Sequence, residues 1–278
     1  MSRIERALEQ AVKSREQKKE TGQADPGLPK AGLPEMPRIE PSFGEFSPYL
    51  ITLADPESPI SEEYRKLKSM VVRISKAGTF QNALMVTSAT TQEGKTITAL
   101  NLAITLAQEY DNTVLLVDAD LRRPSVHEYL GIKPKLGLTD CLAGGANISE
   151  ALIKTGIGKL AILPSGGKVS NPAEMIGSGR MKELARELKS RYGDRYLIFD
   201  APPVLSFADA RTIGPLIDGV LFVVREGHAS LDSVKDALGI LKNIKIFGVV
   251  YNKASISRFD YAYDHYYRGY PRGRTAKK

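Results

Sequence analysis

Hydrophobic residues along the chain form short continuous runs, and segments with helical spacing separate them. The runs cover residues 83–86, 113–120, 160–163, 196–200, 219–224 and 246–251. Between them, apolar positions recur every three or four residues, at 97, 100, 104 and 107 and again over 181–190 and 233–241. Continuous apolar runs are typical of parallel strands that are buried on both faces. The pattern therefore predicts an α/β fold, in which one doubly wound, mostly parallel sheet over residues 61–258 has helices on both faces.

Before this domain the chain changes character twice. Over residues 1–20 apolar positions recur with helical spacing, which predicts an amphipathic helix, but the stripe is narrow and a solvated, frayed end explains it equally well. Residues 21–60 hold eight of the sixteen prolines, which is typical of a semi-rigid extended linker. A helix from residue 62 to 75 is expected next, with Pro59 before it and Ser61 as its cap.

Three charged residues of that helix, Glu62, Arg65 and Lys68, are spaced three apart. From the residues alone we favour ion pairs within the helix, between Glu62 and either Arg65 or Lys66.

Composition narrows the class of protein. Cys141 is the only cysteine, which excludes an intrachain disulfide and a multi-cysteine metal site and favours a reducing cytoplasm. Neither a membrane-spanning run nor a secretory signal is expected. The net charge is +7, and residues 251–278 carry seven Lys and Arg against two Asp.

The segment 86–96, VTSATTQEGKT, follows an apolar run and opens a helical pattern. A phosphate-binding loop requires this order, because the N–H groups and the dipole of a helix start hold an anion. Lys95 would reach the β and γ phosphates of ATP and the Thr96 hydroxyl would bind Mg²⁺. Ala89 replaces the first glycine of the usual G-x-x-x-x-G-K-[ST] pattern. The residues expected to contact ATP are Thr90, Thr91, Gln92, Glu93, Gly94, Lys95, Thr96 and Ile97.

Three carboxylates, Asp118, Asp120 and Asp200, follow apolar runs on strands that we expect to flank the phosphate-loop strand. Ligands of such sheets bind beyond the carboxyl ends of the strands. Buried unpaired carboxylates are costly, so three near Lys95 predict a metal or a cationic network, although each alone could cap a helix or form a loop salt bridge. We expect Thr96, Asp120 and Asp200 to hold Mg²⁺.

Arg122 and Arg123 follow the acidic pair. Their side chains could pair with these carboxylates or stabilise charge during phosphoryl transfer, and the sequence leaves both open.

The segments LLVDADLRRPSVH, LPSGGKVSNPAEM, LIFDAPPVLSFADA and FGVVYNK follow the GKT loop in that order and resemble the bacterial tyrosine autokinases of capsule and exopolysaccharide loci. The similarity covers residues 60–270. It implies a phosphate-loop NTPase fold like that of partition ATPases, protein-tyrosine kinase activity, and Asn252 as a further ATP-binding residue. MSRIERALEQA with its proline linker resembles the branch associated with exosortase-type exopolysaccharide clusters.

SEEYRKLK resembles the E-x-x-R-x-x-R oligomerisation helix of this family, which implies that Glu62, Arg65 and Lys68 contact a neighbouring copy in a homo-oligomer such as a ring. The sequence departs from the family pattern in two places, the phosphate loop and the end of this helix motif. Thr91 and Gln92 stand where the family loop reads Pro-Gly, and Lys68 keeps the charge of the last arginine without its planar fork.

The resemblance also implies partners and a location. An integral-membrane protein that controls polysaccharide chain length and activates the kinase would recruit a cytoplasmic chain to the inner face of the membrane. Other protein substrates are compatible with the family, and no nucleic-acid partner is expected.

Residues 261–270, YAYDHYYRGY, hold five of the twelve tyrosines: Tyr261, Tyr263, Tyr266, Tyr267 and Tyr270. Interleaved aromatic and basic residues are also typical of nucleic-acid or membrane patches. Beside an ATP site the tail is predicted to be a phosphoacceptor, as the resemblance implies. Five phosphates would add roughly −8 to −10 and reverse the charge of this segment, so that a phosphorylated ring dissociates. The nine-residue span from Asn252 to Tyr261 reaches about 30 Å at most, which permits transfer in cis or in trans. The resemblance implies trans.

The expected catalytic residues are Lys95, Asp118 and Asp120, with Asp118 as the base that takes the tyrosine proton or orients the hydroxyl. The nearest alternative is a partition or division-site ATPase that binds membrane or nucleic acid; such proteins carry a second lysine early in the loop, where Thr90 stands. A non-enzymatic binding module would show salt-dependent binding without ATP. An iron–sulfur scaffold ATPase would need paired cysteines.

Overall fold

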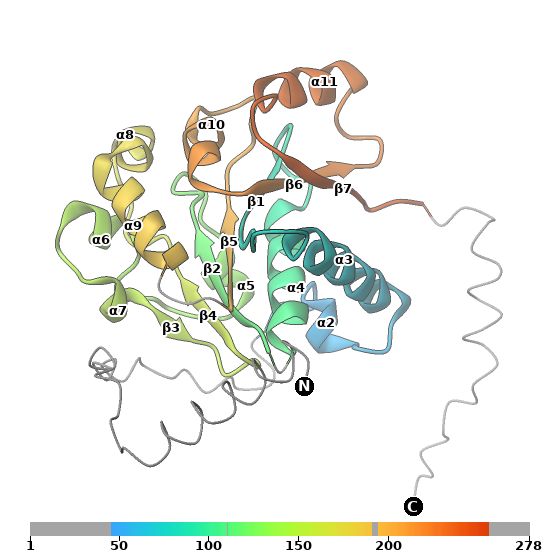
Figure 1. Cartoon of the computed structure of the whole chain (residues 1–278), viewed down its shortest axis with the longest axis horizontal. Coiled ribbons are helices and arrows are strands. Elements are labelled where there is room, and N and C mark those ends of the chain that lie inside the picture. Colours follow the sequence, from blue (N-terminus) through green and yellow to red (C-terminus); the bar gives the residue numbers. More distant parts are fainter. Residues whose placement is uncertain (1–45, 110, 191–193, 256–278) are drawn as a thin grey trace, which may run out of the picture. The chain divides into compact units, whose positions relative to one another are not determined.

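The structure is a computed structural model that describes residues 46–109, 111–190 and 194–255. Seven strands form one sheet in the order β3-β4-β2-β5-β1-β6-β7 (Figure 1). In chain order they are β1 (Ala83–Ser88), β2 (Thr113–Asp118), β3 (Ile153–Lys154), β4 (Leu160–Leu163), β5 (Arg195–Asp200), β6 (Gly219–Arg225) and β7 (Ile246–Asn252). All neighbours pair in parallel except β3, which is antiparallel to β4. The predicted doubly wound fold is confirmed.

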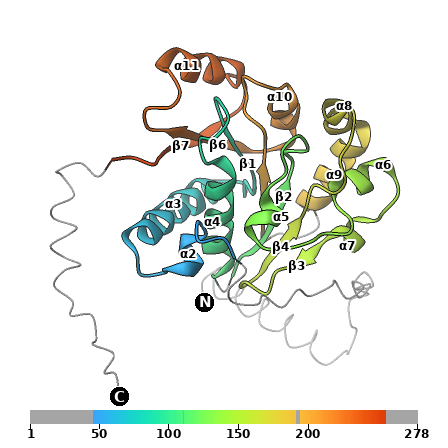
Figure 2. The same cartoon turned by 180° about the vertical axis from the view of Figure 1, so that it is seen from behind.

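Helices cover both faces of the sheet (Figures 1 and 2). One face carries α2 (Ile51–Ala54), α3 (Pro59–Ser75), α4 (Lys95–Ala107) and α5 (Val126–Tyr129). The other carries α6 (Leu138–Ala143), α7 (Ile148–Ala151), α8 (Pro172–Gly177), α9 (Gly179–Ser190), α10 (Asp209–Ile213), the 3-10 turn η1 (Gly214–Leu216) and α11 (Leu231–Ile240). No helix in the three described ranges is both long enough and apolar enough to cross a membrane.

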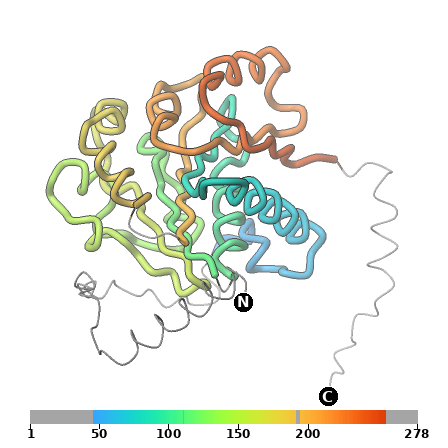
Figure 3. The backbone as a smooth tube through the Cα atoms, viewed as in Figure 1, coloured from blue at the N-terminus to red at the C-terminus, as the bar shows by residue number. Residues whose placement is uncertain are grey.

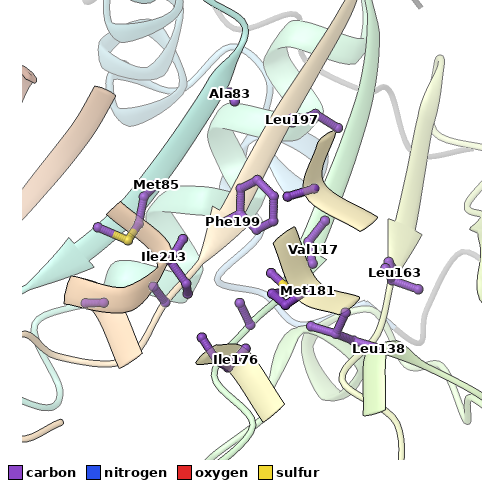
Figure 4. Close-up of a cluster of buried hydrophobic side chains, with 14 of the residues drawn as sticks. Ala83, Met85, Val117, Leu138, Leu163, Ile176, Met181, Leu197, Phe199 and Ile213 are labelled. Atoms are coloured by element: carbon purple, nitrogen blue, oxygen red, sulfur yellow. The ribbon is translucent and has the colours of Figure 1, made fainter. Parts of the chain in front are cut away.

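The central strands are continuously apolar because successive side chains enter two different cores. Met85 and Phe199 point into the core that α8 and α9 cover, which Figure 4 shows, whereas Leu84 and Ile198 enter the core beneath α4. Successive side chains point to opposite faces of a strand, so almost every position of a strand buried on both faces is apolar. This is why the apolar runs located the strands so well.

The strand order corrects one expectation about the carboxylates. Only β5 and β6 pair with β1, and β2 lies beyond β5. The strand of Asp118 therefore does not flank the phosphate-loop strand, although that of Asp200 does. The register of β2 with β5 still brings Asp118 opposite Asp200. The strand β2 ends at Asp118, so Asp120 lies in the following loop rather than on the strand.

The last part of the predicted linker belongs to the folded domain, which begins earlier than residue 61. Leu50 is fully buried, and α2 packs beside α4, as the tube in Figure 3 shows. Helix α3 is capped by Ser58, whose hydroxyl accepts from the Ser61 N–H at 3.2 Å, and not by Ser61. Pro59 at the first helical position explains the earlier start, since proline is favoured there. The predicted N-terminal helix 1–20 and the linker up to residue 45 lie outside the described residues.

Candidate active site

The phosphate loop connects β1 to α4, and its glycine is required by geometry. Gly94 has a left-handed backbone, with φ of 91°. A Cβ at this position would lie 2.1 Å from the amide nitrogen of Asn252 at the end of β7. The φ angle therefore favours glycine, and any side chain here would also have to displace the Asn252 amide.

Glu93, which we expected among the ATP contacts, is buried, and its hydrogen bonds hold the loop in shape. One carboxylate oxygen accepts from the Thr90 N–H at 2.6 Å and from the Thr90 hydroxyl at 2.9 Å. The other accepts from the Arg225 N–H at 3.1 Å, and the Glu93 carbonyl accepts from Asn252 Nδ2 at 2.8 Å. The loop is thus fixed to the carboxyl ends of β6 and β7.

Gln92 has a φ of 63°, the left-handed conformation that glycine adopts freely and that other residues adopt at a cost. This is the position at which the resembling family has glycine. Two side chains at and just after the end of β6 bind the neighbouring carbonyls: the His228 ring nitrogen lies 2.9 Å from Thr91 O, and Arg225 donates to Gln92 O at 3.5 Å. These contacts hold the strained backbone in place.

Lys95 and Asp120 form a partly buried ion pair across the mouth of the loop. Lys95 Nζ lies 2.8 Å from Asp120 Oδ2, and Asp120 Oδ1 accepts from the Arg123 N–H at 3.0 Å. Both oxygens of Asp120 are therefore partnered. An ammonium has three donors, so Lys95 can keep this bond and also bind a phosphate.

Asp118 and Asp200 each keep one buried oxygen unpartnered. Asp118 Oδ2 accepts from the Val126 N–H at 3.2 Å, and Asp200 Oδ2 accepts from the Thr96 hydroxyl at 2.7 Å. The Oδ1 atom of each carboxylate has no hydrogen-bond partner among the described residues. An unpaired buried acceptor is unfavourable, which marks both atoms as places for a ligand.

The titration of these groups follows from their burial. Burial raises the pKa of Asp118 well above its ordinary value, and the nearby Asp200 carboxylate raises it further. Burial also raises the pKa of Asp200, to about 6, although Lys95 and the Thr96 hydroxyl oppose this. Burial lowers the pKa of Lys95, but Asp200 and Asp120 more than offset it, so the pKa is raised. The site thus holds more buried negative charge than Lys95 compensates.

The donor set fits Mg²⁺ bound together with a nucleotide. Among the described residues, no group of three or more His, Cys, Asp or Glu side chains is arranged to hold a metal by itself. Thr96 and Asp200 supply a hydroxyl and a carboxylate with an unpartnered oxygen, both hard ligands. Mg²⁺ is typically bound by one or two carboxylates plus phosphates and water, so two protein ligands suffice.

The structure gives the Arg122 side chain a partner other than the acidic pair. Its guanidinium donates to the buried Asp209 of α10 at 2.8 Å and lies 4.2 Å above the Phe207 ring. Arg122 therefore ties the loop after β2 to the loop after β5. The Arg123 side chain is exposed.

The charged row on α3 is paired within the chain. Arg65 lies 2.6 Å from Glu62, as the favoured ion-pair prediction had it, while Lys66 pairs with Glu63 rather than Glu62. Lys68 pairs with Glu109 at the end of α4, at 2.7 Å. The implied contact with a neighbouring copy stays a prediction.

The structure brings Lys95, Thr96, Asp118, Asp120 and Asp200 together at the carboxyl edge of the sheet. The tyrosines that the sequence predicts as phosphoacceptors, Tyr261, Tyr263, Tyr266, Tyr267 and Tyr270, lie outside the described residues.

Sequence reasoning missed the bracing roles of Arg225 and His228 and the buried Asp209. For Asp209 a signal existed, since an arginine shortly after the acidic pair needs a partner. It also missed Asn101, a polar residue inside the otherwise apolar helical pattern of 97–107.

Comparison with known proteins places this geometry in a family. A family model described as an AAA domain matches residues 89–253. The tyrosine-protein kinase YwqD of Bacillus subtilis (strain 168) is 35% identical over 218 residues, which are 77% of this chain and 90% of YwqD.

Solved structures agree with this assignment. The chimerical protein CapA2B2 matches with a TM-score of 0.69 and 30% identity over 80% of this chain and 95% of its own. The kinase domain of the Escherichia coli tyrosine kinase ETK matches with a TM-score of 0.69 and 29% identity, over 77% of this chain and 84% of that domain. The chain therefore belongs to the bacterial tyrosine-protein kinases and is a protein-tyrosine kinase built on a nucleotide-binding phosphate-loop fold.

Proposed function

We propose that this kinase transfers the γ-phosphoryl group of Mg·ATP to the tyrosine cluster of its own C-terminal tail, Tyr261, Tyr263, Tyr266, Tyr267 and Tyr270. The observation that carries the proposal is the buried Oδ1 of Asp118 near Lys95, which has no hydrogen-bond partner among the described residues. An acceptor tyrosine is the kind of group that would bind it, because its hydroxyl donates a hydrogen bond.

Asp118 acts as the general base in this proposal. The tyrosine oxygen attacks the γ-phosphorus, the new O–P bond forms, the bond to the bridging oxygen of ADP breaks, and the hydroxyl proton passes to the Asp118 carboxylate. The raised pKa of Asp118 supports this role, since a more basic carboxylate accepts a proton more readily.

The remaining residues of the site bind and position ATP. Lys95 contacts the β and γ phosphates while Asp120 orients its ammonium group. Thr96 and Asp200 hold Mg²⁺, which when bound neutralises the phosphate charge. Asp120 would also bind Mg²⁺ only if Lys95 released the Asp120 oxygen that it now binds. The residues 90–94, Ile97 and Asn252 shape the pocket, and the hydrogen bonds of Glu93 to Thr90 and Arg225 support that view.

The tail transfer takes place in trans within a homo-oligomer such as a ring, in which Glu62, Arg65 and Lys68 contact the neighbouring copy. Phosphorylation reverses the charge of the tail and releases the copies. The chain controls exopolysaccharide synthesis or export together with an integral-membrane partner at the inner face of the membrane. The relatives are named as tyrosine-protein kinases, which favours a kinase over a partition-type ATPase.

A phosphosite map tests the proposal. The full-length protein is incubated with Mg·ATP and its phosphotyrosines are mapped by mass spectrometry, beside Lys95→Met. Phosphate on the five tail tyrosines of the wild type, and none on the variant, is the expected result. Absence of phosphate from the wild-type tail contradicts the proposal. Mixing the active protein with tagged Lys95→Met separates the two routes, because only transfer in trans labels the tagged chain.

A further inference from the structure

The helix that follows the phosphate loop contains one asparagine that the kinase reaction described above does not use. Asn101 lies in α4 among apolar neighbours and is fully buried. Asparagine is unfavourable inside helices because its amide competes for backbone groups, and a buried amide without partners is costly. Its presence there calls for specific partners.

Three of the hydrogen bonds of the Asn101 side chain reach the segment that precedes α3. Asn101 Oδ1 accepts from the Thr52 N–H at 3.1 Å and from the Thr52 hydroxyl at 2.9 Å. Asn101 Nδ2 donates to Tyr49 O at 3.0 Å and to Ile97 O at 2.9 Å. The amide thus uses both donors and both acceptor directions. It joins residues 46–57, the linker strap, to the first turn of α4.

The linker strap also reaches α5, the short helix that follows the acidic pair in the chain. The Ser47 N–H donates to Tyr129 O at 3.0 Å, at the end of α5. The Val126 N–H at the start of α5 is the donor that binds Asp118. The strap therefore contacts α4, which carries Lys95 and Thr96, and α5, whose first N–H group donates to Asp118. In Figures 1 and 2, α2 of the strap lies beside α4.

We propose that Asn101 is a positioning residue for nucleotide binding, through which the linker strap fixes α4 and so places Lys95 and Thr96. Hydrogen bonds are directional, and the Tyr49 carbonyl and the Thr52 N–H and hydroxyl meet the Asn101 amide in one position of the helix only.

The test measures the affinity of the full-length protein for Mg·ADP by isothermal titration calorimetry, in Asn101→Ala and Thr52→Val. Thr52→Val removes only the hydroxyl bond and keeps the shape, and Thr52→Ser, which keeps the hydroxyl, is its matched control. The control for buried asparagines is Asn82→Ala. Asn82 is 4% exposed and donates to Arg195 O at 2.7 Å, before β1 and away from the carboxyl edge of the sheet.

We expect Asn101→Ala to weaken Mg·ADP about fivefold to tenfold and Thr52→Val about twofold to threefold, from the usual worth of such bonds. The KM for Mg·ATP should rise by the same factors. Thr52→Ser and Asn82→Ala should bind as the wild type does, even where Asn82→Ala lowers the unfolding temperature as much as Asn101→Ala. Adding Thr52→Val to Asn101→Ala should cost nothing more, because the bond is already lost.

Wild-type affinity in both Asn101→Ala and Thr52→Val, or an equal loss of affinity in Asn82→Ala, overturns the proposal. If Asn101→Ala does not fold, Thr52→Val against Thr52→Ser decides the matter. ADP binding does not involve the tail tyrosines, so this result is independent of the phosphosite map.

Discussion

The two halves of the active site differ in how completely their polar groups are partnered. In the loop half, Glu93 binds Thr90 and Arg225, and Asp120 binds Lys95 and the Arg123 N–H. In the carboxylate half, at the ends of β2 and β5, Asp118 and Asp200 each leave a buried oxygen without a partner among the described residues.

This difference separates residues that build the site from residues that await a ligand. The loop half is held in shape by its own contacts before any nucleotide arrives, which is the preorganisation that phosphoryl transfer requires. The carboxylate half carries uncompensated negative charge that a cation or a hydroxyl would relieve. Substitutions in the two halves should therefore fail in different ways.

The largest expected effect is that of Asp118→Asn on the chemical step. The amide cannot accept the tyrosine proton, so autophosphorylation should fall about 10²- to 10⁴-fold while ATP still binds. Quantitative phosphotyrosine mass spectrometry measures autophosphorylation, and titration with ATP measures nucleotide binding. Near-normal phosphotyrosine would remove Asp118 from the role of base.

Asp200→Asn should raise the Mg²⁺ concentration for half-maximal activity by about tenfold or more. Without metal the same variant should be more stable at pH 7. The folded-state pKa is raised to about 6, so the ionised carboxylate costs stability as the pH rises through 6, and the amide removes that cost. In urea unfolding with EDTA, the difference in the free energy of unfolding between the variant and the wild type should shrink below pH 6. Unchanged Mg²⁺ dependence would contradict the assignment.

A smaller loss, in stability rather than chemistry, is expected for Glu93→Gln in the loop half. The amide group would face a backbone donor and leave one buried group unpaired, at a cost of about 1–2 kcal/mol in the free energy of unfolding. Urea unfolding measures it. The exposed Glu63→Gln on α3 is the control and should leave stability unchanged. A loss equal in both variants would show that Glu93 does not brace the loop.

The smallest effect is expected for Gln92→Gly. Glycine adopts the φ of 63° without strain, so despite its greater freedom in the unfolded chain the variant should gain about 0.5 kcal/mol. Gln92→Ala should give no gain, because alanine keeps the strain. Thermal unfolding of both variants is the measurement, and a destabilised glycine variant would mean that the Gln92 side chain supports the loop.

Sequence reasoning worked best where one local pattern had one structural cause. The apolar runs located six of the seven described strands. For the five strands inside the sheet, burial on both faces leaves almost no polar position, whereas the edge strand β7 is apolar but partly exposed. Sequence reasoning failed for β3, which has only two residues, Ile153 and Lys154, and for the short helices α2, α5, α6, α7, α8 and α10. Elements of this length carry too little periodicity to be recognised, and their conformation is fixed by the layers they pack on.

The sequence by itself determined the doubly wound fold, the phosphate loop at Gly94 to Thr96, and the gathering of acidic residues at the carboxyl edge, since spacing and strand ends are local properties. Tertiary structure alone decided that β5 separates β2 from β1, that Arg122 binds Asp209, and that residues 46–60 join the domain. Each of these depends on which distant segments become neighbours. Such contacts repay the entropy of ordering the chain only once the whole sheet has formed, so no local pattern encodes them.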